Sequence, residues 1–348
     1  MLKSRLCIAF FAFAVGCAPA QKPLTDYVNP MLGTATLWDS VDLGFKPTKR
    51  TWGAEVFPGS SLPNAMVQVS PVTKFHSGAG YQYEDSVIYG FTHTNKGHWN
   101  LCHIPLLPVT GTPTPGDYCS PFSHERESAA PGYYQVFLDR YGVDAQLSST
   151  LRCAFHKYTY PAGAAASLLA DLQRSNEHVR AWDIRKEGDN VFAGWQQTGE
   201  KMYFYAVANR PVTGIEPVVE GDREVRIVRF GEGDGALELR IGFSFVSEKN
   251  ARENLEAEML GKSFAEVRSE ATATWNDLLG RIRVEGGTER EKGLFYSSLY
   301  RSFLWPALRS DVNGEFTDVD GKVINPGFRY YTGPSYWDDY RNKLILLG

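Results

Sequence analysis

Short segments in which hydrophobic residues alternate with other residues fill most of the chain between positions 65 and 245. In Arg223–Phe230, Val225, Ile227 and Phe230 nearly alternate with arginines, which is typical of a half-buried strand. Similar segments, rich in β-branched and aromatic residues, are Ala65–Val69, Tyr133–Leu138, Arg152–Tyr160, Val191–Gln196, Met202–Ala208 and Leu237–Phe243. Short strands without helices between them predict a large antiparallel β-sandwich.

Beyond position 247 the spacing of apolar residues becomes helical. Ser263 with Glu266 and Thr288 with Glu291 have the spacing of helix capping boxes, and an apolar stripe follows each pair. A third helix is expected to open near 335–339 and to run into the apolar residues at the end of the chain. Because the chain stops inside this apolar run, we expect it to be the N-terminal part of a longer protein.

These patterns divide the chain into four parts. They are a signal segment (1–20), a β-sandwich domain (21–247), a helical linker (248–283) and the truncated beginning of a helical catalytic domain (284–348).

The first twenty residues have the features of an export signal. Lys3 and Arg5 precede an apolar run that is too short to span a bilayer as a stable anchor. Ala18–Ala20 fits a signal-peptidase site, whereas Ala14–Cys17 resembles a lipobox with Cys17 as the lipidated residue, which we prefer. Either cleavage predicts an exported protein, in the periplasm or anchored to the outer membrane of a bacterium.

Three cysteines remain after this segment: Cys102, Cys119 and Cys153. An odd number in an oxidising compartment permits at most one disulfide bond. Cys102 with Cys119 is the preferred pair, and three free thiols are the alternative.

Composition excludes two classes of protein. The 348 residues include 36 Lys and Arg against 40 Asp and Glu, a net charge of −4, and 43% are hydrophobic. This apolar content excludes a disordered chain. Basic residues do not outnumber acidic ones, which argues against nucleic-acid binding. The sequence also lacks the G-x-S-x-G, H-E-x-x-H and P-loop motifs.

Residues 90–100 hold the densest group of candidate ligand-binding side chains. His93 and Trp99 lie here with several hydrogen-bonding residues, after an aromatic-rich strand. Hydrogen-bonding groups beside an aromatic plane are what a sugar site needs. The alternative is that the histidines are satisfied by the backbone and only line the edge of the sandwich. The spacing of these histidines and Cys102 fits a zinc site poorly.

Three acidic motifs near the end of the chain have simpler interpretations than calcium binding or acid–base catalysis. Asp311–Gly314 and Asp318–Gly321 lack the register of an EF-hand loop, so we expect turns of a small hairpin. Asp338 and Asp339 are consecutive, so on a helix they point about 100° apart and cannot face each other across a substrate. One of them can stabilise the helix start while the other points into a cleft.

Taken together, several segments resemble glycoside hydrolase family 92, the exo-acting α-mannosidases of glycan-degrading bacteria. In the order of the family they are Tyr27–Thr34, Phe57–Gly59, Pro63–Pro71, Gly80–Tyr81, Ile88–Thr94, Phe295–Tyr300, Ser310–Gly314, Tyr330–Thr332 and Trp337–Arg341. Each motif is weak alone, but the ordered set is specific and spans nearly the whole mature chain.

The resemblance implies a β-sandwich, a helical linker and an (α/α)6 barrel that is cut short here. It implies inversion at the anomeric carbon and a calcium ion whose ligands cannot be assigned in this sequence. Trp337 and Asp338 would contact the sugar, together with the loop candidates His93 and Trp99. The catalytic Glu and Asp are expected beyond Gly348, so no catalytic residue is expected within this chain, and the chain alone should be inactive.

We therefore expect a monomeric, calcium-dependent exo-α-mannosidase that removes terminal α-mannosyl residues from N-glycans or mannans, with no nucleic-acid partner and no transmembrane span. Two alternatives stay open: a non-catalytic carbohydrate-binding protein, and another β-sandwich plus (α/α)6 glycosidase or phosphorylase. The chain departs from the family pattern at His93–His98, where the family commonly has His-Thr-His-x-Ser-Gly, and at Asp339, where it has Thr. The first departure leaves the linkage specificity open.

Overall fold

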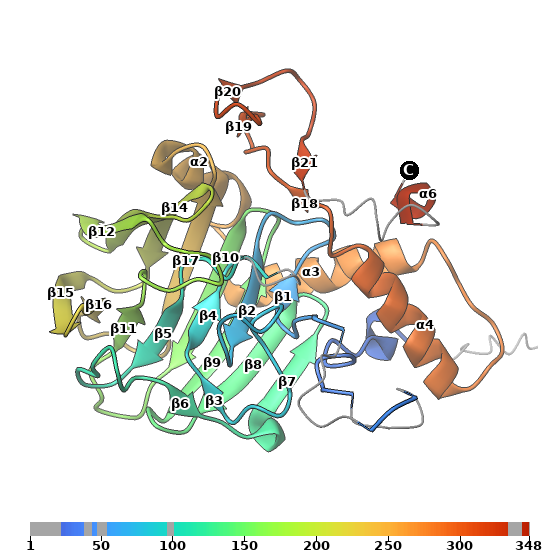
Figure 1. Cartoon of the computed structure of the whole chain (residues 1–348), viewed down its shortest axis with the longest axis horizontal. Helices are drawn as coiled ribbons and strands as arrows, with labels where there is room; N and C mark the ends of the chain where they lie inside the picture. Colours follow the sequence, from blue (N-terminus) through green and yellow to red (C-terminus); the bar gives the residue numbers. More distant parts are fainter. Residues whose placement is uncertain (1–21, 38–43, 47–53, 96–100, 333–342, 348) are drawn as a thin grey trace, which may run out of the picture.

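The structure is a computed structural model that describes residues 22–37, 44–46, 54–95, 101–332 and 343–347 (Figure 1). Two large sheets dominate this part of the chain, and all their paired strands are antiparallel. The prediction of a large antiparallel β region is therefore confirmed.

The first sheet has seven strands. In spatial order they are β1 (Ser60–Ser61), β2 (Gln68–Val72), β4 (Gly90–Thr92), β5 (Leu106–Val109), β11 (Ser167–Ala170), β16 (Arg223–Phe230) and β15 (Val212–Glu220).

The second sheet has eight strands. In spatial order they are β12 (Ala181–Gly188), β13 (Val191–Gln197), β14 (Lys201–Ala208), β17 (Leu237–Ser244), β10 (Cys153–Thr159), β9 (Val143–Ser149), β8 (Tyr133–Leu138) and β7 (Glu127–Ala130).

Three short strand pairs complete the β structure of the described residues. They are β3 (Val87–Ile88) with β6 (Ser120–Pro121), β18 (Ala307–Leu308) with β21 (Tyr331–Thr332), and β19 (Phe316–Thr317) with β20 (Val323–Ile324). The last pair encloses the Asp318–Gly321 turn, where Gly321 N–H donates to Asp318 O at 3.1 Å. The predicted hairpin is therefore confirmed.

The described helices are η1 (Leu24–Tyr27), η2 (His124–Arg126), α2 (Glu248–Glu258), α3 (Phe264–Leu279), α4 (Glu289–Ser302) and α6 (Lys343–Leu347). Both predicted capping boxes are present, at the starts of α3 and α4. None of these helices is long and apolar enough to cross a bilayer. The expected start of the third helix, at 335–339, lies outside the described residues.

One hydrophobic core is shared by the two large sheets. Phe91 of β4 contacts Tyr134 of β8 and Tyr158 of β10, with ring centroids 6.5 and 6.3 Å apart. Along β14, buried and half-buried residues alternate strictly, as expected for a strand with one face in a core. Each large apolar side chain buried in this way contributes about 1.5–3 kcal/mol, so the shared core holds the sheets together.

Helix α2 lies against the other face of the eight-stranded sheet. A Cβ atom at Gly242 of β17 would lie 2.1 Å from the carbonyl oxygen of Ala251 in α2. Only glycine therefore permits this close approach of helix and strand. Leu255 of α2 and Met259, which directly follows this helix, join Phe264 of α3 in a second apolar cluster over the strands β8 and β10.

A third cluster joins α3, α4 and η1 at the end of the molecule opposite β12, β15 and β16 (Figure 1). Trp275 of α3 is fully buried, its ring centroid lies 4.4 Å from that of Tyr300 in α4, and its Nε1–H donates to Ser61 O at 2.8 Å. The helices are thus attached to the first sheet through both apolar packing and a hydrogen bond.

All three described cysteines are free thiols, so the preferred Cys102–Cys119 bridge is not formed. Cys102 is buried with its Sγ atom 3.7 Å from Asn95 Oδ1. Cys119 lies beside the β8–β9 turn instead, where its carbonyl oxygen accepts from Arg140. Burial raises the pKa of Cys102 to about 12, so this thiol stays protonated and unreactive at neutral pH.

Candidate functional site

His93 directly follows β4, and its side chain is fully buried in the structure. Its Nδ1 lies 2.9 Å from Ile104 O, and its Nε2 lies 3.0 Å from His156 Nε2. Burial lowers the pKa of His93 to about 3, so the ring is neutral. His93 thus matches the alternative interpretation, in which the histidine is held by hydrogen bonds inside the sandwich. Its buried ring does not lie on the surface of the described residues.

The residues on both sides of 96–100 are anchored in the same buried network. Thr94 Oγ1 lies 2.7 Å from His103 Nδ1, and Asn95 N–H donates to Gln68 Oε1 at 3.0 Å. Asn95 also forms a β-bridge with Leu101. Asn95 and Leu101 are therefore held together by the fold, and Trp99 itself lies outside the described residues.

The backbone between Leu101 and Ile104 is strained. Leu101, Cys102 and Ile104 have φ angles of 72°, 60° and 55°, in the left-handed region that side chains other than glycine rarely adopt. Each such residue costs about 1–3 kcal/mol. The strain persists because the buried network around His103 and Asn95 holds the backbone in place.

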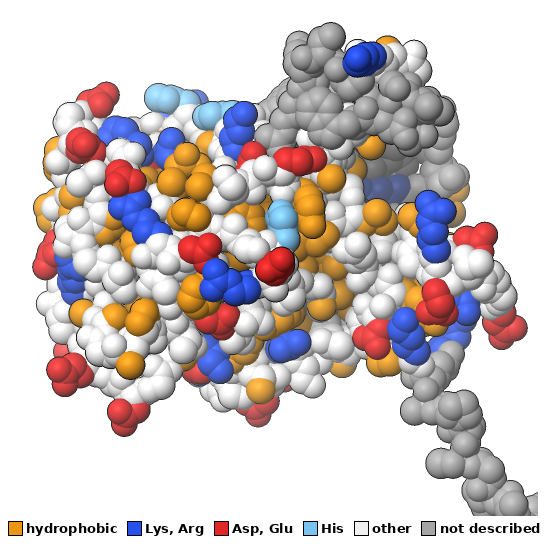
Figure 2. Space-filling model, turned by 90° about the horizontal axis from the view of Figure 1, so that it is seen from below, with side chains coloured by type: hydrophobic (Ala, Val, Ile, Leu, Met, Phe, Trp, Pro, Cys, Tyr) orange, Lys and Arg blue, Asp and Glu red, His pale blue; other side chains and the backbone are white. Residues whose placement is uncertain are grey.

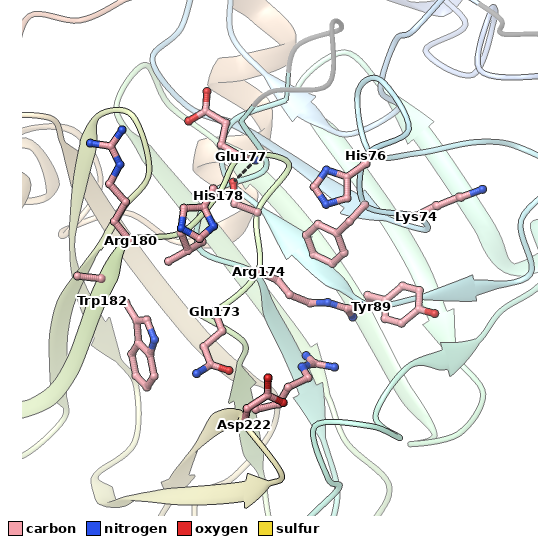
Figure 3. Close-up of a pocket in the computed structure, with 15 residues that line it drawn as sticks. Lys74, His76, Tyr89, Gln173, Arg174, Glu177, His178, Arg180, Trp182 and Asp222 are labelled. Atoms are coloured by element: carbon pink, nitrogen blue, oxygen red, sulfur yellow. Dashed lines mark hydrogen bonds between the residues drawn. The ribbon is translucent and has the colours of Figure 1, made fainter.

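A cavity of about 920 Å³ adjoins this segment (Figure 3). One of its walls is the connection between β11 and β12, where Ser175 Oγ donates to Leu101 O at 2.6 Å. The N–H of Asn176 donates to the same carbonyl at 2.8 Å, and Asn176 Oδ1 accepts from His76 N–H at 2.8 Å. These bonds fix the cavity wall to the backbone at Leu101 and to that at His76. The sequence did not single out this cavity.

Three further predicted site residues lie outside the described part of the chain: Trp337, Asp338 and the lipidation candidate Cys17. The segment that leads to Trp337 is described as far as Thr332 in β21, which pairs with Ala307 of β18. Leu308 N–H in turn donates to Asn64 O at 2.9 Å. The described segment before Trp337 is thus linked through β18 to the connection between β1 and β2, by strand pairing and a hydrogen bond.

Asp311 has a role that the sequence did not reveal. It forms the expected turn, with Gly314 N–H donating to Asp311 O at 3.0 Å, but its carboxylate is also buried. Ser244 Oγ and Asn250 Nδ2 donate to its Oδ2 at 2.6 and 2.9 Å, and Asn254 Nδ2 donates to its Oδ1 at 2.7 Å. The carboxylate thus connects β17 and α2 to the segment before the hairpin.

The described residues contain no group of three or more His, Cys, Asp or Glu side chains arranged to hold a metal ion. Calcium requires six to eight oxygen ligands. No calcium ligands are therefore assigned among the described residues.

Comparison with known protein families gives two adjoining matches. The description Glycosyl hydrolase family 92 N-terminal domain matches residues 27–254, and Glycosyl hydrolase family 92 catalytic domain matches residues 250–348. The chain therefore belongs to glycoside hydrolase family 92, as its motifs indicate.

Solved structures of this family resemble the chain. A family 92 α-mannosidase from Bacteroides thetaiotaomicron superposes with a TM-score of 0.82 at 26% identity, over 92% of this chain and 46% of that one. The same enzyme has been solved with mannoimidazole. An inverting family 92 mannosidase from the same organism, at 24% identity and a TM-score of 0.77, covers 93% of this chain and 46% of its own and shows the shared fold.

A curated relative is an uncharacterised secreted glycosidase from Arthroderma benhamiae. It is 24% identical over 344 residues, which cover 83% of this chain and 42% of the relative. The chain thus spans less than half the length of the relatives that it matches.

Proposed function

We propose that this chain is the N-terminal part of an exo-α-mannosidase that removes terminal mannose from N-glycans or mannans with inversion. The observation that carries the proposal is the tandem match to both family 92 domains, supported by the likeness to a family 92 α-mannosidase. The inverting relative with the same fold supports the stereochemistry.

For the architecture, we propose a β-sandwich, a helical linker and the first helices of an (α/α)6 barrel. The core shared by the two large sheets supports the sandwich. The capped helices α3 and α4, which pack on each other through Trp275 and Tyr300, support the start of a helical domain.

We place the catalytic acid and base beyond Gly348, so that the present chain alone is inactive. The support is that this chain matches less than half the length of each solved family 92 structure described above. Trp337 and Asp338 are proposed to bind the terminal mannose, with Asp338 accepting hydrogen bonds from its hydroxyls. Calcium dependence is proposed from the family resemblance alone.

The protein is further proposed to be exported as a monomer, to the periplasm or as an outer-membrane lipoprotein with lipid on Cys17. The apolar segment after Lys3 and Arg5 supports export, and the curated relative is named as secreted. Nucleic acid is not a proposed partner: positive and negative side chains are interspersed on the face shown in Figure 2.

The test is hydrolysis of α-mannosides by the complete protein, followed by proton NMR of the released sugar. We expect β-mannose to appear first, no turnover of α-glucosides, and no dependence on phosphate. Binding without turnover would favour the non-catalytic alternative, and phosphate-dependent cleavage would favour a phosphorylase. Turnover by residues 21–348 alone would contradict the location of the acid and base.

A further inference from the structure

The turn between β13 and β14, residues 198–200, is fastened at both of its ends. Thr198 is fully buried, and its Oγ1 lies 2.9 Å from Nε2 of His103. Glu200 Oε2 accepts a hydrogen bond from Arg309 Nη2 at 2.9 Å. The turn itself is tight, because Thr198 N–H donates to Glu200 O at 2.9 Å. The fold therefore holds the Glu200 carboxylate in one orientation.

The guanidinium that holds Glu200 is itself buried. The Arg309 side chain is 9% exposed, and its guanidinium lies 3.7 Å from the ring centroid of Phe245. Burial lowers the pKa of Arg309 below its usual value, because the charged form loses hydration. Its Nε has no hydrogen-bond partner among the described residues. Burying this cation therefore costs folding free energy, which a carboxylate partner must offset.

Glu200 offsets little of that cost. Its side chain is 59% exposed, and an ion pair with so exposed a partner contributes little to stability. Its Oε1 accepts no hydrogen bond from another described residue. Stability therefore does not explain this pair, which instead presents a fixed carboxylate with one available oxygen on the outside of the sandwich.

The buried side of the same turn lies against strained backbone. Three of the residues 101–104 have left-handed φ angles, and His103 is the fourth. Its Nδ1 lies 2.7 Å from Thr94 Oγ1, so one imidazole connects the strained backbone, Thr94 and the turn. Backbone strain of this kind clusters at ligand-binding sites, where the surrounding structure holds it in place. Strain, a buried imidazole and a buried guanidinium thus occur together around one turn.

The chain enters two segments with proposed sugar contacts from residues near this turn. Thr94, which bonds to His103, precedes the segment of Trp99 in the sequence. Arg309 N–H donates to Tyr330 O at 2.8 Å, and Tyr330 precedes the segment of Trp337. The turn therefore lies at the end of the sandwich from which both segments begin.

We propose that Glu200 is a specificity-determining residue, which accepts hydrogen bonds from hydroxyls of the sugar next to the terminal mannose. Arg309 is the positioning residue that orients its carboxylate. The inference rests on the proposed function, since it takes the ligand to be a mannoside. An exo-acting site encloses the terminal sugar, so a largely exposed carboxylate suits the following sugar. A carboxylate only accepts, so it selects hydroxyl donors, and its charge strengthens their bonds.

The experiment is steady-state kinetics of the complete protein on two substrates. One is the α-linked mannobiose that the wild type cleaves fastest, and the other is an aryl α-mannoside, whose leaving group carries no hydroxyl. Glu200→Ala should raise KM for the mannobiose about tenfold with little change in kcat, because it removes a bond made equally in the ground and transition states. KM for the aryl mannoside should match the wild type. An unchanged KM for the mannobiose, or equal increases for both substrates, overturns the proposal.

Two conservative variants keep the test valid if Glu200→Ala disturbs folding by leaving Arg309 unpaired. Glu200→Gln retains an oxygen acceptor for the guanidinium, so its melting temperature should match the wild type, while KM for the mannobiose rises by a smaller factor. Arg309→Lys keeps the charge but not the guanidinium geometry, and should also raise KM for the mannobiose alone. Lower melting temperatures with unchanged KM values would assign the pair to stability and refute the proposal.

Glu216 of β15 is the matched control. Its side chain is 55% exposed and its Oε2 lies 3.0 Å from Arg229 Nε, so it is a similarly exposed carboxylate held by an arginine. It lies on an edge strand of the other large sheet. Glu216→Ala should leave KM unchanged for both substrates. An increase as large as that of Glu200→Ala would show a general effect of charge, against the proposal.

Calorimetric titration with the mannobiose separates this inference from the proposed function. A wild type that binds the mannobiose but cleaves no mannoside, with about tenfold weaker binding in Glu200→Ala, would refute the enzyme proposal and support the contact. Turnover by the wild type with equal binding in Glu200→Ala would do the reverse. Neither binding nor turnover by the wild type would overturn both.

Discussion

The Nε2 atoms of His93 and His156 lie 3.0 Å apart, and both side chains are fully buried. The His93 Nδ1–H donates to Ile104 O, because a carbonyl oxygen can only accept. His93 Nε2 therefore accepts from His156 Nε2–H, and His156 Nδ1 accepts from the hydroxyl of Tyr158 at 2.5 Å. This chain of bonds requires both imidazoles to be neutral, since a proton on His93 Nε2 would face another N–H.

The first prediction concerns acid stability. Burial lowers the pKa of His93 to about 3 and that of His156 well below 6.5, and it lowers the pKa of His103 to about 4. The unfolded chain therefore binds more protons than the folded chain below about pH 6.5, and stability decreases as the pH falls from there towards 3. Each imidazole should contribute a loss of about 2 kcal/mol between pH 7 and pH 5.

Urea titrations at pH 5 and pH 7 measure this loss. His156→Gln removes one buried imidazole and should lower the pH dependence by about that amount. His178→Gln, at an exposed position, is the control and should retain the wild-type dependence. An unchanged pH dependence in His156→Gln would contradict the neutral pair.

The second prediction compares two Asp-x-x-Gly segments. Asp311→Ala leaves the buried donors of Ser244, Asn250 and Asn254 without their acceptor, so we expect a loss of about 3 kcal/mol or more. Asp318 accepts only from backbone N–H groups in an exposed turn, so Asp318→Ala should cost about 1 kcal/mol or less. Denaturant titrations of the two variants check this, and equal losses would show that Asp311 is only a turn residue.

The third prediction concerns the sugar contact assigned to Asp338. Charge-assisted hydrogen bonds to sugar hydroxyls are about twice as strong as neutral ones. If they tighten in the transition state, Asp338→Ala in the complete enzyme should lower kcat/KM about 10²-fold, or about 3 kcal/mol. Asp339→Ala is the control and should have a much smaller effect. Normal kinetics with a lower melting temperature in Asp338→Ala would assign this residue to helix capping instead.

The fourth prediction is that the complete enzyme depends on calcium. Excess EDTA should abolish hydrolysis of α-mannosides, and added calcium should restore it. Full activity of the chelated enzyme, with metal removal verified by elemental analysis, would remove calcium from the proposal.

Sequence patterns predicted those elements that are determined by residues close to one another along the chain. The capping boxes at Ser263 and Thr288 and the turn at Asp318–Gly321 each depend on residues at most four positions apart. Strand β9, Val143–Ser149, was not predicted, because its polar composition is compatible with a loop. It forms a strand because β8 and β10 pair with it on both sides.

The sequence by itself determined the antiparallel β class, the capped helices and the family, because alternation, helix caps and ordered motifs are all readable along the chain. Only the tertiary structure decided what the polar side chains do. His93 is buried because β10 brings His156 against it, and Asp311 is buried because α2 brings Asn254 to its carboxylate. The cavity beside the β11–β12 connection likewise assembles segments from Lys74 to Arg223, whose proximity depends on the pairing of distant strands. Burial and charge at these sites are properties of contacts between distant segments, which no local pattern encodes.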